Sequence, residues 1–270
     1  MEISAVCIGE KWLPYRKAGP EHFFSVHSVF NKVINISTDQ GLLSVAAEGC
    51  GGSSAFLTVP GRKLDFDAEM GEPCIVQAGC MFLADHTINF RHAAIWNGPI
   101  IKGYGHKKIK KENITAFKAV LDRKAVPKSA YRYINSESES RFSGFEAIQR
   151  LRDDPSRAKS LIGLGQGLTP AGDDMLLGFM AIVNHTCENR EYVRMLHNAV
   201  SDSLHKTAEI SAQTLVNALN CDYHELVQNC VRDLCEGGKE EVYISAASLI
   251  SMGATSGSDI ACGMYLGMIN

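Results

Sequence analysis

The spacing of the apolar residues changes partway along the chain, and this change constrains the fold more than any other feature. Up to about residue 105, short runs alternate apolar and polar side chains, as in Phe-Ser-Val-His-Ser-Val-Phe at residues 24–30. A period of two is typical of half-buried strands. Beyond residue 110 the apolar positions recur at helical spacing, for example Met175, Phe179 and Val183. The pattern predicts an α+β chain with a β-rich N-terminal domain, a small barrel or sandwich, followed by a C-terminal helical bundle.

Three parts are expected from this change. Residues 1–110 form the β-rich domain, residues 111–142 form a connecting helix and a polar, serine-rich linker, and residues 143–270 form the helical domain. Turn signals place strands at residues 24–30, 33–37, 42–46, 55–59, 74–83 and 87–96. Helices are expected at residues 113–124 with Asn113 as N-cap, at 144–153, after Pro170, and near 192–203, 208–219, 223–235, 241–250 and 260–269.

Charge and composition exclude several classes of protein. Lys and Arg total 27 against 30 Asp and Glu, a net charge of −3, whereas nucleic-acid binding normally requires a basic surplus. No apolar run approaches the length of a membrane span, and the first residues are too polar for a signal peptide. The basic run at 106–111 is expected to be solvated. The nine cysteines include no Cys-x-x-Cys pair, so we expect reduced thiols in a cytoplasmic protein.

The strongest motif is Gly-Leu-Thr-Pro-Ala-Gly-Asp-Asp at residues 167–174, which follows Gly163 and Gly165. Glycines permit positive φ and close approach of a ligand to the backbone. The start of a helix offers free N–H groups and a partial positive charge, which suit a carboxylate or phosphate. The motif is neither a dinucleotide loop nor a P-loop. The candidate ligand-binding residues are Gly165, Gly167, Thr169 and Gly172, with Thr169 acting either as a helix cap or as a hydroxyl donor.

Asp173 and Asp174 complicate this anion interpretation, because a carboxylate repels a phosphate at short range. Three roles remain open for the pair. The two carboxylates could hold Mg²⁺ that bridges to the anion. They could accept hydrogen bonds from an amide or amine of the ligand. They could also complement the positive end of the helix with no ligand at all.

A second segment, Gly-Ala-Thr-Ser-Gly-Ser-Asp at residues 253–259, repeats this character. In both segments a glycine precedes a threonine by two residues, and the threonine precedes an aspartate by four. Hydroxyl and N–H groups at a helix start can cradle a carboxylate or phosphate. The candidates are Thr255, Ser256, Gly257 and Asp259. We predict that the two helix-start loops converge on a shared pocket.

A third segment places hydroxyl groups on one helical face. Thr207, Ser211 and Thr214 are spaced four and three residues apart, so they either line a polar cavity or lie on a solvent face. Thr207 and Ser211 are further candidate ligand-binding residues. His27 and Ser28, in the first alternating strand, are expected to be structural.

Segments 163–178, 207–215 and 253–263, together with His-Ser-Val-Phe at 27–30, resemble one bacterial family. This family includes a subunit of the three-subunit oxamate carbamoyltransferase of anaerobic allantoin degradation, a route of purine catabolism. The resemblance implies a cytoplasmic transferase complex with two other protein subunits, one of which resembles the succinyl-CoA synthetase α-subunit. It implies carbamoyl phosphate and a small carboxylate or amide acceptor as substrates, with no nucleic acid and no membrane.

The resemblance also assigns roles at the site. The helix starts would hold anionic groups, and the candidate catalytic residues Asp173, Asp174 and Asp259 would accept from amide nitrogens. No cofactor is expected for this reaction, with Mg²⁺ at the aspartates left open as an alternative. Two alternatives remain. The chain could be a Mg²⁺-dependent hydrolase of a phosphorylated or ribosylated small molecule, with the three aspartates as metal ligands. It could also be a non-catalytic ligand-binding or scaffolding subunit.

Overall fold

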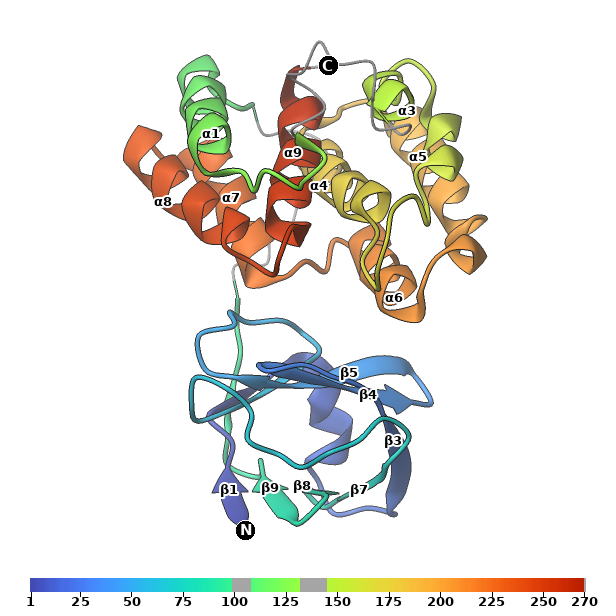
Figure 1. The fold of residues 1–270 in the computed structure, drawn as a ribbon, viewed down its shortest axis with the longest axis vertical. Helices are drawn as coiled ribbons and strands as arrows, with labels where there is room; N and C mark the ends of the chain where they lie inside the picture. Colours follow the sequence, from blue (N-terminus) through green and yellow to red (C-terminus); the bar gives the residue numbers. More distant parts are fainter. Residues whose placement is uncertain (99–107, 132–144, 270) are drawn as a thin grey trace. The chain divides into compact units, whose positions relative to one another are not determined.

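The computed structural model describes residues 1–98, 108–131 and 145–269, and it divides into two compact units, Met1–Gly98 and Pro99–Asn270 (Figure 1). The strands of the described residues lie in the first unit, and the second is helical. The predicted α+β class is therefore confirmed. The bounds 1–110, 111–142 and 143–270 stay a prediction. Residues 99–107 and 132–144, which include parts of the expected basic run and linker, lie outside the described residues.

The first unit is built on one curled sheet of ten strands among the described residues, in the order β1-β9-β8-β7-β3-β4-β5-β6-β2-β10. Alternation along the strands places Phe24, Val26, Ile36 and Val45 in its core, as the period of two predicts. The strands are β1 (Glu2–Ser4), β2 (Cys7–Ile8), β3 (His22–Val29), β4 (Val33–Thr38), β5 (Gly41–Ala47), β6 (Phe56–Val59), β7 (Pro73–Gln77), β8 (Cys80–Leu83), β9 (His86–Asn89) and β10 (Ala94–Ile95), with a 3-10 helix at Glu10–Tyr15.

The expectation of one strand over residues 74–83 is wrong. The segment is a hairpin of β7 and β8, which turns at Ala78 with φ +47° and Gly79 with φ +74°. Two successive left-handed residues are what a two-residue hairpin turn requires. Alanine is not typical of turns, so the sequence of the two strands indicates one continuous apolar strand. The expected strand at 87–96 is likewise divided into β9 and β10.

The second unit is an assembly of helices, several of which match the predicted ranges closely. They are α1 (Lys111–Lys124), α3 (Phe145–Gln149), α4 (Ala171–Thr186), α5 (Arg190–Ser201), α6 (Glu209–Leu219), α7 (Glu225–Glu236), α8 (Lys239–Ile250) and α9 (Ser256–Ile269), with 3-10 turns η2 (Pro155–Ser160) and η3 (Leu204–Lys206). Helix α9 begins four residues before its predicted start. Residues 257–259 therefore belong to its first turn.

Helices α4 and α9 lie side by side at the centre of this unit (Figure 1). Residues 172–185 of α4 are buried on every face, which fits a helix that is apolar all round. A Cβ atom on Gly178 would lie 1.9 Å from the carbonyl oxygen of Ile260, and one on Gly263 would lie 1.8 Å from that of Met175. The two backbones therefore touch at two reciprocal points that only glycine permits.

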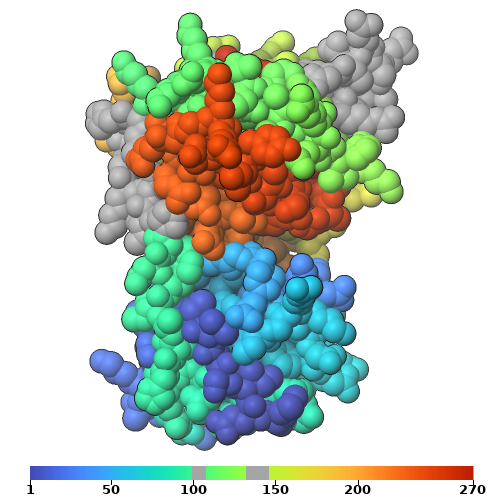
Figure 2. Space-filling view, turned by 90° about the vertical axis from the view of Figure 1, so that its left-hand side faces the viewer, coloured from blue at the N-terminus to red at the C-terminus, as the bar shows by residue number. Residues whose placement is uncertain are grey.

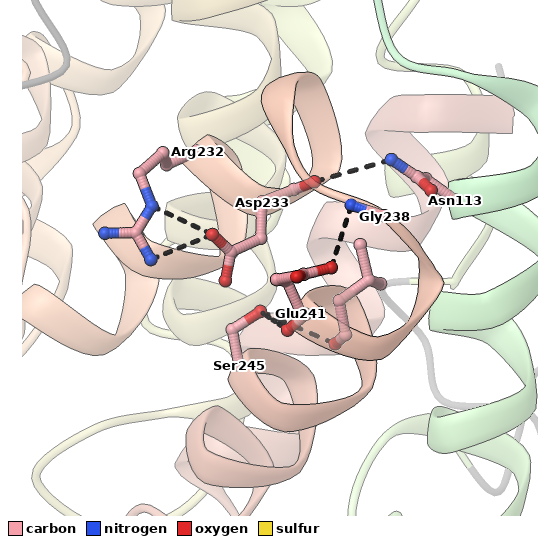
Figure 3. A network of polar contacts seen from close by, with 7 residues as sticks. Asn113, Arg232, Asp233, Gly238, Glu241 and Ser245 are labelled. Atoms are coloured by element: carbon pink, nitrogen blue, oxygen red, sulfur yellow. Dashed lines mark hydrogen bonds and ion pairs between the residues drawn. The ribbon is translucent and has the colours of Figure 1, made fainter.

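Asn113 does not cap the first helix of this unit, contrary to expectation. Lys110 is the N-cap of α1, and the Asn113 side chain lies within the helix. Its Nδ2 donates to carbonyl oxygens at the end of α7, including those of Leu234 at 3.0 Å and Gly237 at 3.1 Å. Figure 3 shows this side chain directed at the carbonyl of Asp233. Asn113 thus satisfies carbonyls that a helix end leaves unpaired.

Helix α1 also packs against α8, and Figure 2 shows its green surface beside the orange surface of α8. The start of α8 is fixed by Glu241, whose Oε2 accepts from the Gly238 N–H at 3.0 Å (Figure 3). No helix among the described residues combines the length and the apolar character needed to cross a bilayer. The nine cysteines all lie in the described ranges, and none of them forms a disulfide.

Candidate functional site

The glycine-rich segment before α4 is shaped by close backbone packing. A Cβ on Gly163 would lie 2.2 Å from the Lys206 carbonyl oxygen, and one on Gly172 would lie 2.2 Å from that of Leu161. Gly165, at φ +133°, lies against the Ala171 nitrogen. These three glycines are therefore required by the fold itself. Gly167 has φ +86° with open space around its Cβ position, and residues 165–168 are exposed.

The α4 helix begins without a side-chain cap. Pro170 occupies the N-cap position, and its carbonyl accepts from the N–H groups of Asp173 and Asp174. The capping role considered for Thr169 is therefore wrong. Its Oγ1 instead lies 2.9 Å from the Ser256 Oγ at the start of α9. This contact joins the two helix-start loops. The pocket that both loops were expected to share stays a prediction, and no residue of 253–259 lines the cleft at the start of α4.

Asp173 joins three segments of the chain. Its Oδ1 accepts from the Gly163 N–H at 2.8 Å, and its Oδ2 accepts from the Thr207 hydroxyl. Ser211 also donates to it. Burial raises the pKa of the Asp173 carboxyl, and these hydrogen bonds oppose that rise. Asp173 therefore anchors the loop before α4 and the start of α6, a structural role that accounts for Thr207.

Asp174 is in a different situation. Only 6% of the residue is exposed, and its carboxyl group accepts from Ser256. Its Oδ2 is buried and has no hydrogen-bond partner. Burial raises the pKa of Asp174 to about 8, and the negative charges of Asp259 and Asp173 add to the rise. A buried carboxyl oxygen without a partner is uncommon, because desolvation is then uncompensated.

Asp259, at the equivalent place in α9, has its partners. Its Oδ1 accepts from the Ala130 N–H at 2.6 Å, and Thr255 also donates to it. The neighbouring Ser258 Oγ accepts from the Val126 N–H at 2.9 Å. Burial raises the pKa of Asp259 to about 6. The start of α9 is therefore fastened to the segment that follows α1.

A small cleft of about 10 Å³ opens at the start of α4. Its lining comes from the loop before α4, from the first turns of α4 and from α6, and consists of Thr169, Asp173, Asp174, Leu177, Ser211, Thr214 and Leu215. Ser211 and Thr214 thus both line this cleft, which is closer to the cavity alternative for that stripe than to the solvent face. Thr207 lies before α6 and contacts Asp173 instead.

The remaining predicted residues do not line this cleft. Thr255 and Asp259 bind each other, and Gly257 packs so closely that a Cβ would lie 2.0 Å from the Leu249 carbonyl oxygen. Leu177 and Leu215 were not predicted, because nothing distinguishes them from core leucines in the sequence. Within residues 1–98, 108–131 and 145–269, no three or more His, Cys, Asp or Glu side chains are placed to hold a metal ion.

His27 and Ser28 belong to a hydrogen-bonded row in the sheet. The Ser28 Oγ lies 3.1 Å from the His27 Nδ1 and accepts from the Asn35 Nδ2 at 2.9 Å. The Asn35 Oδ1 in turn accepts from the Ser44 hydroxyl at 2.8 Å. The row crosses β3, β4 and β5 at the bulge in β3. It gives these polar side chains partners within the sheet, which is a structural arrangement.

Comparison with known proteins gives one finding for this site. Residues 161–268 match the family model described as oxamate carbamoyltransferase subunit AllH. The match contains the loop before α4, the start of α6 and the start of α9. No curated protein matches the chain, and no solved structure does.

Proposed function

Because the chain belongs, through residues 161–268, to the oxamate carbamoyltransferase subunit AllH family, we propose that it is a subunit of a carbamoyltransferase complex. The complex transfers the carbamoyl group of carbamoyl phosphate to oxamate or a similar acceptor. Two other protein subunits complete it in the cytoplasm, and the reaction serves allantoin degradation. The observation that carries the proposal is the junction of the two helix-start loops at Thr169 and Ser256.

The reaction joins the planar carbamoyl group of one small molecule to the nitrogen of another. The acceptor nitrogen attacks the carbamoyl carbon, the bond from that carbon to the phosphate oxygen breaks, and the nitrogen loses a proton as phosphate leaves. Such a transfer depends on holding both molecules in register and on stabilising charge as it develops. It needs no covalent nucleophile on the protein. Hydrogen-bonding groups on rigid helix starts meet the positioning requirement.

The site offers two different environments for the ligand. The exposed backbone at residues 165–168, with open space at Gly167, supports contact with an anionic group. Thr169 lies between this loop and the cleft that Asp173 and Asp174 line. We propose that the ligand lies across Thr169 and that Asp174 contacts it directly. Asp173 and Asp259 then act as positioning residues, because their carboxylates already hold the loops.

The test is carbamoyl transfer by the complex of this chain with its two other subunits. The assay follows phosphate release from carbamoyl phosphate that depends on oxamate. We expect Asp174→Asn to lower the rate at least tenfold. Asp202→Asn, an exposed aspartate at the end of α5, serves as the matched control and should retain the rate. Absence of transfer by the complete complex contradicts the proposal.

The Mg²⁺-dependent hydrolase remains a second candidate, because two carboxyl groups line one cleft. It requires Asp174 to be ionised, whereas burial raises its pKa to about 8. Calorimetric titration with Mg²⁺ separates the candidates. Micromolar binding that Asp173→Asn abolishes favours the hydrolase, and its absence favours the transferase. A melting-temperature shift with carbamoyl phosphate, without turnover in the full complex, would instead indicate a ligand-binding subunit.

A further inference from the structure

We propose that the cleft beside Asp174 binds the –NH₂ group of a primary amide, so that the amide end of the ligand, and not its anionic end, lies between α4 and α6. This inference deepens the proposed function and rests on it. It names which end of a carbamoyl or oxamate-like molecule the cleft selects. Size, hydrogen-bonding capacity and charge support it together.

The size of the cleft limits its occupant. Its volume of about 10 Å³ is close to the roughly 10–15 Å³ that one water molecule needs. An –NH₂ group is about as large as a water molecule. A whole phosphate group, with its oxygens around phosphorus, does not fit within this space, whereas one –NH₂ group or one carboxylate oxygen does, so hydrogen bonding and charge must distinguish these two. Only a single small polar group therefore enters.

The hydrogen-bonding capacity of the lining favours a donor. Three hydroxyl groups and two carboxyl groups line the cleft, from Thr169, Ser211, Thr214, Asp173 and Asp174. The Thr214 hydroxyl donates to the Ile210 carbonyl at 2.9 Å, so its lone pairs remain available. The buried Asp174 Oδ2 has no hydrogen-bond partner, so its desolvation is uncompensated. An N–H group placed there removes this cost.

The charge of the lining opposes an anion. The seven lining residues include two carboxyl groups and no basic side chain. The groups that face Asp174 are Asp173 on α4 and Asp259 on α9, which both raise its pKa. Glu209, the titratable residue of α6, is exposed. An anion here would be repelled by whichever of these carboxyl groups is ionised, in a low-dielectric environment, whereas an N–H donor would be stabilised by it.

Proton linkage follows from this arrangement. In the empty cleft burial raises the pKa of Asp174 to about 8, so the carboxyl is mostly protonated at neutral pH. An N–H donor favours the ionised form, so binding releases a proton and strengthens as the pH rises toward 8. An anion would favour the protonated form, and its binding would weaken with rising pH. The sign of the pH dependence therefore distinguishes the two types of ligand.

The experiment is calorimetric titration of the full chain with oxamate, oxalate and N,N-dimethyloxamate at pH 6.5 and 7.5. We expect oxamate affinity to rise up to about tenfold over this interval, the change that one pH unit produces below a controlling pKa. Heats measured in buffers of different ionisation enthalpy should show proton release. Oxalate and dimethyloxamate, which lack the –NH₂ group, should bind at least tenfold more weakly. Asp174→Asn should remove the pH dependence, and Asp202→Asn should retain it.

Three results would overturn the inference: oxalate binding as tightly as oxamate, oxamate affinity that falls with pH, or no oxamate binding by folded chain. Thermal unfolding of each variant establishes that it is folded. The inference and the proposed function fail separately. Amide selectivity without carbamoyl transfer by the complete complex leaves the inference standing alone. Transfer without a dependence on the –NH₂ group in binding leaves only the proposed function.

Discussion

The starts of α4 and α9 are built alike but leave their buried aspartates in different states. In each helix a glycine follows the aspartate by four residues and contacts the other helix, Gly178 after Asp174 and Gly263 after Asp259. Asp259 accepts from the Ala130 N–H and from Thr255. Asp174 accepts from Ser256 and keeps one buried oxygen without a partner.

The difference shows that the same arrangement at a helix start can either complete the packing or leave a carboxyl oxygen available for a ligand. At α9 the chain that follows α1 supplies the donor, so the helix start is complete. At α4 no donor from the described residues reaches the Asp174 Oδ2, and a cleft lies beside it. Judged by the glycine contacts between the helices, Asp174 corresponds to Asp259. The repeated spacing of glycine, threonine and aspartate in the two segments instead aligns Asp173 with Asp259. Asp173 instead has the anchoring role.

The largest expected effect comes from breaking the contact that relates the two helices. Gly263→Ala places a Cβ 1.8 Å from the Met175 carbonyl oxygen, so α4 and α9 must separate. We expect a loss of about 3 kcal/mol or more in the free energy of unfolding, measured by urea denaturation. Gly267→Ala, where the nearest atom is a side-chain carbon at 3.1 Å, is the milder control. Equal stability of the two variants would contradict the close contact.

Removing the Asp173 side chain should have the next largest effect. Asp173→Ala leaves the Gly163 N–H and the Thr207 hydroxyl without their acceptor. Hydrogen bonds to a charged group contribute about 1.5–3 kcal/mol each. Because the two bonds share one carboxylate, we expect the free energy of unfolding to fall by about 3 kcal/mol or less. Chemical denaturation measures it. Asp174→Ala, which removes fewer contacts, should cost less, and the reverse order would show that Asp174 is the anchor.

Asp174 and Asp259 should also differ in the pH range over which they change the stability of the protein. Both pKa values are raised in the folded protein, so stability is greatest at low pH and falls as pH rises through the window between the unfolded and folded values. That window extends from about pH 4 to 6 for Asp259 and to about 8 for Asp174. Each contributes up to about 1.4 kcal/mol per pH unit within its window. Asp174→Asn should flatten the pH 6–8 range of urea midpoints, whereas Asp259→Asn should not.

The smallest expected effect concerns the hydroxyl pair that joins the loops. Thr169→Val and Ser256→Ala each remove one side of the 2.9 Å contact. A double-mutant cycle of unfolding free energies should give a coupling of about 0.5–1.5 kcal/mol, the contribution of one neutral hydrogen bond. A coupling near zero would mean that the two loops are held together by the glycine contacts alone.

The sequence predicted the elements well where periodicity was clean. Strands β3 to β6 and helices α5 to α8 lie within a few residues of their expected ranges. The prediction failed at residues 74–83, where the chain makes a hairpin turn at Ala78, a residue type that does not indicate a turn. It also misassigned Asn113, whose partners at the end of α7 lie more than 100 positions further along the chain.

Several residues of the candidate site could be predicted from the sequence, but the role of each residue could not. Helical spacing predicted that Ser211 and Thr214 share a face but left open whether that face lines a cavity or meets solvent, and in the structure both residues line the cleft. The glycine cluster suggested a ligand, yet Gly163, Gly165 and Gly172 are explained by backbone contacts. Which aspartate lacks a partner depends on whether a distant N–H, such as that of Ala130, reaches it. No local pattern carries that information.

The reciprocal glycine contacts of α4 and α9 also determine what the site cannot do. With carbonyl oxygens seated directly on the opposite Cα positions, neither helix can slide or roll past the other without a steric clash. The distance between the two helix starts is therefore fixed. Only the rotation of a few hydroxyl groups can adjust the site to a ligand. The wall that α4 contributes to the cleft is therefore held in place by α9, although α9 does not line the cleft itself.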